Sequence, residues 1–147
     1  MFQKIEYVLG IGGVEIPAGA TVEVYAKSEV AFAPIYFMIA PHLAFGFLIL
    51  DIKMEGKSQI KSPLFGRSDE LPASIFAVSE PIRLNFDSVL KGQTVSVAVR
   101  NSLKESRHFS GAFSGLKLQG SAALYHLVRT ACKNLFEKER VSLCQKK

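Results

Sequence analysis

The stretch of the chain from residue 30 to residue 50 carries no Asp, Glu, Lys or Arg side chain. It is long enough for a membrane-spanning helix, which needs about 20 predominantly apolar residues. However, Pro34 and Pro41 lie inside it, and a proline in a helix interior removes a backbone hydrogen bond at a cost of about 3 kcal/mol. β-branched and aromatic residues dominate on both sides of Pro41, as in half-buried strands. The sequence therefore predicts two buried strands, Phe32–Ala40 and Leu43–Met54, and no membrane span.

Shorter segments with a two-residue apolar alternation lie on both sides of this pair, as in Thr21–Lys27. We expect strands at 3–16 (interrupted at Gly10, Gly12 and Gly13), 21–27, 32–40, 43–54, 58–61, 82–87, 94–100 and 107–118, and a short helix at 71–78. No long helical repeat separates the strands, which argues against a parallel α/β sheet. The predicted fold is a mainly β, antiparallel sandwich of about eight strands.

The C-terminal segment has a different periodicity. After Ser121, a plausible helix N-cap, apolar residues recur at the spacing of one helix face. A single amphipathic helix of about 16–20 residues is expected here, docked on the sandwich or on a neighbouring subunit. The chain then divides into a sandwich with an N-terminal strand or arm, residues 1–118, and a basic helix with a tail, residues 119–147.

The net charge of +5 is confined to the last part of the chain. Residues 1–116 are formally neutral, and residues 117–147 contain the basic side chains Lys117, Arg129, Lys133, Lys138, Arg140, Lys146 and Lys147. Such an asymmetry indicates an acidic partner for this segment, for example nucleic acid. A solvated helix face with a frayed basic end is the simpler explanation.

No constellation of side chains that supports catalysis stands out. His42, His108 and His126 have no second ligand at a recognised metal spacing, and no G-x-S-x-G motif occurs. Asp51 and Glu55 are four residues apart across a turn, where surface solvation is the safer interpretation. We expect no enzyme activity, no metal and no cofactor.

The two cysteines and the N-terminus bear on the compartment. Cys132 and Cys144 would lie about 18 Å apart on one helix, too far for a disulfide, so free thiols in a reducing compartment are expected. The first residues lack the order of a secretory signal, and no Asn-X-Ser/Thr acceptor occurs. The sequence therefore does not suggest secretion.

The uncharged stretch also indicates assembly, because a continuous apolar strand needs cover on both faces of its sheet. A second copy of the chain would supply that cover. The side chains that we predict at such a subunit interface are Phe45, Phe47, Leu124, Leu127, Val128 and Leu135.

Residues 42–116 carry a recognisable order of motifs. They are the segments Phe47–Lys53, Ser58–Ile60, Leu71–Ala77, Ile82–Asp87, Gly92–Asn101 and Phe109–Gly115. In this order the chain resembles small single jelly-roll virion proteins of bacteriophages. The resemblance implies a capsid, vertex or decoration component that acts by self-assembly in the virion, is made in the host cytoplasm and contacts copies of itself and other virion proteins. The basic C-terminal helix is not part of the pattern.

Two other functions fit the residues. One is a carbohydrate- or peptide-binding sandwich whose site is formed by loops 62–70 and 101–107. The other is a nucleic-acid-binding protein that uses Lys117–Lys147, for which counterion release predicts a steep loss of affinity with salt.

Overall fold

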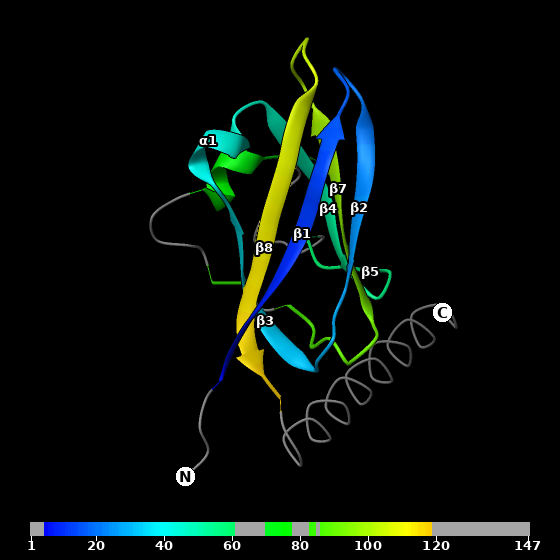
Figure 1. The fold of residues 1–147 in the computed structure, drawn as a ribbon, viewed down its shortest axis with the longest axis vertical. Coiled ribbons are helices and arrows are strands. Elements are labelled where there is room, and N and C mark those ends of the chain that lie inside the picture. The colour runs from blue at the N-terminus through cyan, green and yellow to red at the C-terminus, as the bar shows by residue number, and fades with distance from the viewer. Residues whose placement is uncertain (1–4, 61–69, 78–82, 85, 119–147) are drawn as a thin grey trace, which may run out of the picture.

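The computed structural model describes residues 5–60, 70–77, 83–84 and 86–118, which form two facing β-sheets (Figure 1). In chain order the elements are β1 (Glu6–Ile16), β2 (Thr21–Lys27), β3 (Phe32–Ile39), the helix α1 (Pro41–Ala44), β4 (Phe47–Met54), β5 (Lys57–Ser58), β6 (Leu71–Pro72), the 3-10 helix η2 (Ala73–Phe76), β7 (Thr94–Asn101) and β8 (Arg107–Lys117). The mainly β fold class is confirmed.

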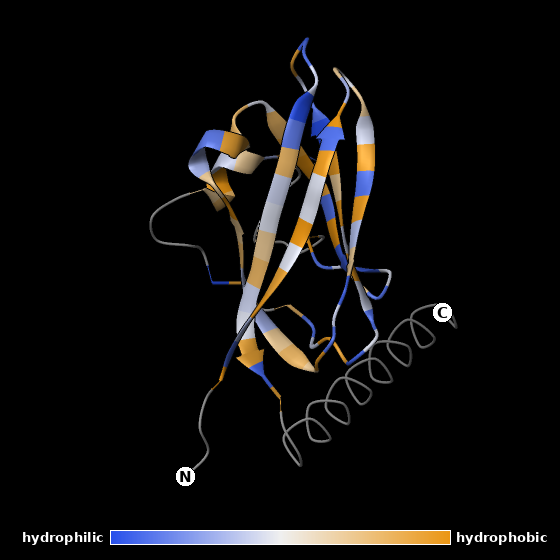
Figure 2. Ribbon diagram, in the orientation of Figure 1, coloured by the Kyte–Doolittle hydropathy of each residue, from blue (hydrophilic) through white to orange (hydrophobic). Residues whose placement is uncertain are grey.

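One sheet has the strand order β1-β8-β3 and the other β2-β7-β4-β5, with β6 paired to β4. Every pair is antiparallel. The chain crosses from one sheet to the other at β1 to β2, β2 to β3 and β3 to β4, and it then stays in the second sheet from β4 to β7. Hydrophobic and hydrophilic bands alternate along β2 in Figure 2, as expected for a strand with one face in the core. The prediction of an antiparallel sandwich-like arrangement is confirmed at this level.

The uncharged stretch is strand, short helix and strand, and no helix in the described part of the chain is long and apolar enough to cross a membrane. The prediction that the second strand starts at Leu43 is wrong, because α1 occupies Pro41–Ala44 and β4 starts at Phe47. Pro41 lies in the first turn of α1, where its missing N–H costs no hydrogen bond. Gly46, with a φ of 84°, then makes the turn into β4.

Phenylalanine rings from both sheets fill the space between them. Phe37 and Phe113 stack with ring centroids 4.7 Å apart, and Phe76 of η2 meets Phe37 edge-on at 5.0 Å. Phe47 and Phe109 form a second edge-on pair at 5.3 Å. Full burial of such a side chain stabilises a fold by about 1.5–3 kcal/mol. This aromatic core explains how the sandwich forms without tryptophan.

The glycine interruption predicted in the first strand is a β-bulge. The register of β1 against β8 shifts between Gly12 and Val14, and Gly12 has a φ of 105°. A Cβ atom at Gly12 would lie 2.7 Å from the carbonyl oxygen of Phe109, so only glycine fits there. The β4–β5 hairpin is also as predicted, since Glu55 and Gly56 both have positive φ, the conformation of a tight hairpin turn.

The strand predicted at 82–87 is wrong for its described residues, 83–84 and 86–87. The segment still lies beside β3, because Leu84 N donates to Ile35 O at 2.8 Å and Val89 pairs with Phe32. Pro34 lies two residues after Phe32 on the edge of β3 that faces this segment, and it has no N–H to donate. A bulge in β3 follows Pro34. Among the described residues of this segment, the pairing with β3 therefore consists of isolated contacts.

Other predicted elements differ in extent or fall outside the described residues. The strand predicted at 58–61 is the two-residue β5, which leaves Gln59 and Ile60 outside a strand. The helix predicted at 71–78 is the 3-10 helix η2, preceded by β6. The C-terminal helix and the domain boundary after residue 118 concern residues 119–147, which lie outside the described part of the chain.

Candidate functional site

The outer surface of the β2-β7-β4-β5 sheet is a charged face with internal pairing. Glu23 accepts a hydrogen bond from Ser96 Oγ at 3.0 Å and lies 3.6 Å from Lys53 Nζ. Arg100 contacts Glu70 through both terminal nitrogens, at 2.6 and 2.7 Å. We call this surface the charged face; these ions are already paired with one another.

Tyr25 is the exposed aromatic residue of the charged face, with 62% of its surface accessible. Its hydrogen bond to Glu23 raises the pKa of the phenol, because the carboxylate accepts the phenolic proton. The hydrogen bond from Ser96 is the main cause that lowers the pKa of Glu23. The ring of Tyr25 is therefore open to solvent beside the Glu23 carboxylate.

The outer surface of the β1-β8-β3 sheet has a different character. Along β8 the side chains of Phe109 and Phe113 enter the core, and the alternate residues face outward beside their partners in β1 and β3. The outward residues are Val8 and Gly10 of β1, Ser110, Ala112, Ser114 and Leu116 of β8, and Ala33, Tyr36 and Met38 of β3. We call this surface the uncharged face.

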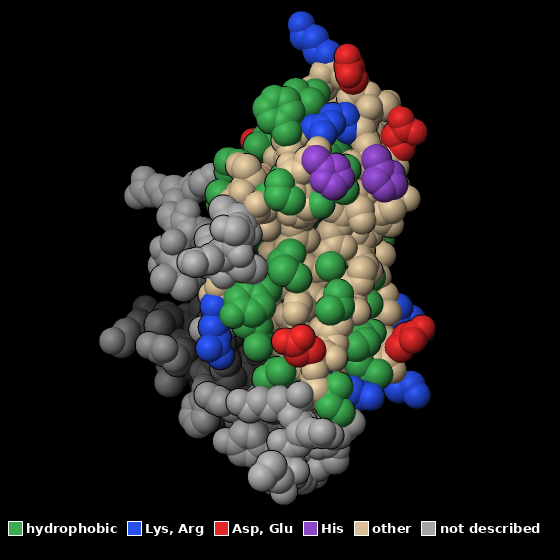
Figure 3. Space-filling view, turned by 60° about the vertical axis from the view of Figure 1, so that its left-hand side comes forward, with side chains coloured by type: hydrophobic (Ala, Val, Ile, Leu, Met, Phe, Trp, Pro, Cys, Tyr) green, Lys and Arg blue, Asp and Glu red, His purple; other side chains and the backbone are tan. Residues whose placement is uncertain are grey.

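The carboxylates and the histidine of this sheet's outer side lie at the two ends of the uncharged face, with Glu6 at one end and the cross-strand pair Glu15 and His108 at the other. Figure 3 shows mostly hydrophobic and uncharged atoms between the two histidines above and charged side chains below. Val8, in the middle, is 58% exposed. The uncharged face can be buried without removing a charge from water.

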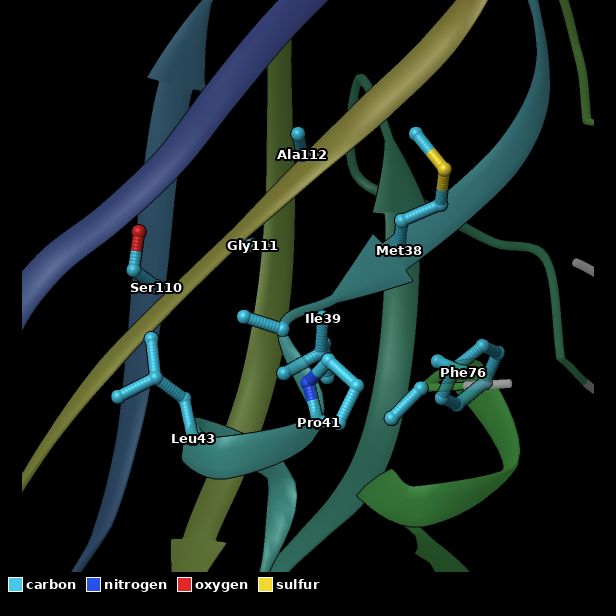
Figure 4. A pocket seen from close by; sticks show the side chains of 10 residues that line it. Met38, Ile39, Pro41, Leu43, Phe76, Ser110, Gly111 and Ala112 are labelled. Atoms are coloured by element: carbon cyan, nitrogen blue, oxygen red, sulfur yellow. The ribbon is translucent and has the colours of Figure 1, made fainter. Parts of the chain in front are cut away.

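A hollow of about 580 Å³ adjoins the uncharged face beside α1. Its walls come from β3, α1, η2 and β8 (Figure 4). The lining residues are Met38, Ile39, Ala40, Pro41, Leu43, Phe76, Ala77, Ser110, Gly111 and Ala112. The Ser110 hydroxyl is the one polar side chain among them. We call it the α1 hollow; its chemistry suits an apolar group.

Phe45 comes two residues after the wall residue Leu43 in the chain, and its side chain is 72% exposed. The guanidinium of Arg107 lies 5.9 Å from the centre of its ring and 5.3 Å from that of Phe47. Arg107 Nη2 donates to the carbonyl oxygen of His42 at 3.4 Å, whereas Nη1 is buried and has no hydrogen-bond partner among the described residues. An exposed aromatic ring beside a cation is thus held at the end of β8.

The predicted interface residues fall in different places. Phe45 is at the surface, whereas Phe47 is 2% exposed and packs on Phe109; the placement of both at a subunit interface stays a prediction. Lys117 is half-buried at the end of β8, where its N–H donates to Ile5 O. The remaining predicted interface and acidic-partner residues lie outside the described residues: Leu124, Leu127, Val128, Leu135, Arg129, Lys133, Lys138, Arg140, Lys146 and Lys147.

The side chains weighed for chemistry have structural roles. Asp51 accepts a hydrogen bond from Ser58 Oγ at 2.5 Å, and Glu55 accepts one from Thr94 N at 2.7 Å. The two carboxylates therefore serve the β4–β5 hairpin and its junction with β7. Within the described ranges no three His, Cys, Asp or Glu side chains come together in a way that could hold a metal ion.

Of the two loops predicted to form a binding site, 101–107 is described and 62–69 lies outside the described residues. Asn101 is fully buried and fixes the described loop. Its Nδ2 donates to Ile16 O at 3.0 Å and Glu105 O at 2.7 Å, and its Oδ1 accepts from Leu103 N at 3.0 Å. The loop is therefore tied to the β1–β2 corner.

Sequence reasoning missed the α1 hollow, because its walls come from segments up to about 70 residues apart that no local pattern connects. The apolar run that contains Phe45 gave no signal of the hollow, because it does not distinguish the exposed Phe45 from the buried Phe47. Comparison of the chain with known protein families, with curated proteins and with solved structures finds no match.

Proposed function

We propose that the protein is a non-catalytic structural component of a bacteriophage particle, a single jelly roll that acts by associating with copies of itself. The proposal combines the motif resemblance of residues 42–116 with the character of the uncharged face. It places the protein in the virion, with itself and other virion proteins as partners.

The strand order supports the jelly-roll part of the proposal. An eight-stranded jelly roll built from two Greek keys interleaves its strands as 1-8-3-6 and 2-7-4-5. The two sheets here have the orders β1-β8-β3 and β2-β7-β4-β5, and the additional two-residue strand β6 pairs with β4 in the second sheet. The segment from Leu84 to Val89, hydrogen bonded to the free edge of β3, stands where the sixth strand of a jelly roll would lie.

The observation that carries the assembly part is the contrast between the two outer surfaces. Burying the charged face would remove the Glu23–Lys53 and Arg100–Glu70 pairs from water, at several kcal/mol per ion before any compensation. The uncharged face carries no such cost between Glu6 and Glu15. Burial of its apolar atoms contributes about 25 cal/mol per Å². Association through the uncharged face is therefore the less costly of the two.

The test is the molar mass of the purified full-length chain across a wide concentration range, by sedimentation and by size exclusion with light scattering. We expect a symmetric oligomer, visible as a regular particle in electron micrographs. Ser114→Glu should dissociate it, because the new carboxylate would lie in the middle of the uncharged face. Thr21→Glu is the matched control, since it places the same charge on the outer side of β2.

A monomer at every concentration would overturn the proposal, and so would an oligomer that Ser114→Glu leaves intact while Thr21→Glu dissociates it. Both variants are at solvent-facing positions, so circular dichroism should show the same folded state for each. A difference in oligomeric state is then assigned to the surface and not to unfolding.

The exposed ring of Tyr25 favours a second candidate, a non-catalytic carbohydrate-binding module. An open aromatic ring flanked by the polar groups of Glu23, Ser96 and Lys53 is a surface on which a sugar ring can stack and form hydrogen bonds. This candidate predicts a monomer that binds a glycan and loses that binding in Tyr25→Ala. A glycan array probed with the wild type and with Tyr25→Ala decides between the structural component and the carbohydrate-binding module.

A further inference from the structure

We propose that two copies of this chain pair about a two-fold axis beside α1, each copy placing its Phe45 ring in the α1 hollow of the other. The inference rests on the proposed self-association and names the contact that produces it. The occupant of the α1 hollow is thereby a second copy of the same chain.

Phe45 has the properties of an interface anchor. It is 72% exposed, and the backbone that follows it is held in place. Ser102 donates to the carbonyl oxygen of Gly46 through its backbone N at 2.9 Å and its Oγ at 2.7 Å. A Cβ atom at Gly46 would lie 2.5 Å from the side chain of Leu103, so the two loops are in close contact. An aromatic side chain on such a fixed backbone loses little conformational entropy on binding.

The α1 hollow has the size and the chemistry to receive that ring. The α1 hollow has about 580 Å³, and Met38, Leu43 and Phe76 contribute to its apolar walls. Its own Phe45 does not fill it, because that ring is 72% exposed.

The nearness of the two features selects a two-fold arrangement. Phe45 follows Leu43, a wall residue, by two positions, so the backbone that carries the ring adjoins the wall of the hollow. In a two-fold interface the same patch is used by both copies, and each contact occurs twice. A ring and a hollow that adjoin one another can both be filled in a closed dimer, with no free partner left to extend a filament.

The outer surface of the β1-β8-β3 sheet around Phe45 and the hollow supplies the rest of the area of the dimer interface. It also contains both positive and negative side chains. A three-stranded sheet with strands about 4.8 Å apart, in which one strand of 11 residues rises about 3.3 Å per residue, covers about 500 Å² in projection. With Phe45 and the hollow this approaches the roughly 800 Å² per partner of a standard interface. Arg107 and Glu15 stand near the same end of the sheet, so a two-fold copy can bring opposite charges together.

The test uses one variant for the ring and one for the hollow in the full-length chain. Phe45→Ser removes the ring, and Ala112→Phe fills the hollow from the middle strand β8. The matched controls are Tyr25→Ser, which removes an exposed ring from the charged face, and Ala98→Phe, which enlarges an outward alanine on the middle strand β7. Sedimentation equilibrium gives the dimer association constant of each protein.

Loss of one anchor of about 2 kcal/mol lowers an association constant about 30-fold, so loss of both in a symmetric dimer lowers it about 1,000-fold. We expect this loss for Phe45→Ser and Ala112→Phe alone, and less than about threefold for the controls. An equimolar mixture of the two variants should form a heterodimer only about 30-fold weaker than the wild-type dimer. In that heterodimer one intact ring meets one open hollow, and at the other contact the ring is absent from one copy and the hollow of its partner is filled.

Three outcomes overturn the inference. Phe45→Ser that dimerises like the wild type shows that another contact holds the copies together, and the proposed function then stands without this inference. A mixture that stays as weak as the single variants excludes the pairing of ring and hollow. A wild-type chain that is monomeric at all concentrations removes both the inference and the proposed function.

Discussion

Gly115 offers the sharpest test of how the β1-β8-β3 sheet is held together. It lies on β8 opposite Pro34 of β3, where the two backbones approach closely. A Cβ atom at Gly115 would lie 2.0 Å from the carbonyl oxygen of Ala33 and 2.7 Å from Pro34 Cα. Both neighbours are backbone atoms, which cannot rotate away as a side chain can. Gly115→Ala therefore requires a shift of β3 itself.

The size of the effect follows from that distance. To reach an ordinary contact of 3.4 Å, the Ala33 oxygen must move by at least 1.4 Å, enough to break the neighbouring ladder hydrogen bonds. Overpacking costs about 1–3 kcal/mol, and each lost hydrogen bond about 1 kcal/mol more. We expect Gly115→Ala to lower the free energy of unfolding by about 3–5 kcal/mol. That is a large share of the roughly 5–15 kcal/mol of a typical domain.

Gly10 is the matched control, because it lies on β1 of the same sheet and a Cβ atom there would meet nothing within 4 Å. Gly10→Ala should leave the stability unchanged or raise it by about 0.5–1 kcal/mol, since glycine is unfavourable within a strand. Urea unfolding followed by far-UV circular dichroism at one protein concentration compares the three proteins. If the two variants differ by less than about 1 kcal/mol, the close approach of β3 to β8 at Gly115 is refuted.

Three further predictions concern other parts of the chain. Asn101→Ala should lower the free energy of unfolding by about 3 kcal/mol in the same urea assay. The reason is that the Ile16 and Glu105 carbonyl groups and the Leu103 N–H lose their hydrogen-bond partner. A decrease below about 1 kcal/mol would contradict this structural role of Asn101. The pKa of Glu23 is lower in the folded state than the 4.5 of the unfolded state, so the ionised carboxylate stabilises the fold above pH 4.5, and this stabilisation is lost as the pH falls through the folded pKa. The wild type should therefore lose more stability than Glu23→Gln between about pH 6 and about pH 3. Equal losses in the two proteins would exclude the effect. If residues 117–147 bind duplex nucleic acid through seven basic side chains, a plot of log affinity against log salt concentration should have a slope of up to about −6. Deletion of residues 119–147 should then abolish binding. Binding that does not depend on salt would exclude this function.

The strands that sequence reasoning located well are those whose alternation is set by one buried face. Thr21–Lys27 was predicted with its observed bounds, because Val22, Val24 and Ala26 face the core and charged residues face solvent. The bounds of β7 and β8 differ from the prediction by one residue each. In such strands the local pattern and the tertiary environment agree, so periodicity is sufficient.

The wrongly predicted strand bounds occur where backbone geometry, and not hydrophobicity, determines the secondary structure. The apolar run from Leu43 onward reads as strand, but Pro41 starts a short helix and Gly46 turns the chain with a positive φ before β4 begins. The clean alternation of 82–87 is likewise overruled, because the facing edge of β3 presents Pro34, which cannot donate a ladder hydrogen bond. The partner strand determines pairing there, and a single-segment pattern does not contain that information.

The candidate site extends the same reasoning to the surface. Phe45 and Phe47 are indistinguishable in sequence, two phenylalanines of one apolar run, but the structure buries Phe47 and leaves Phe45 72% exposed. The difference arises from Gly46, whose φ of 84° falls between them and reverses which side of the chain faces the core. The α1 hollow beside Phe45 exists only because β3, η2 and β8 converge there. The contacts within one copy leave the Phe45 ring in solvent and the α1 hollow unfilled by it. A second copy that places its ring in the hollow would explain both features.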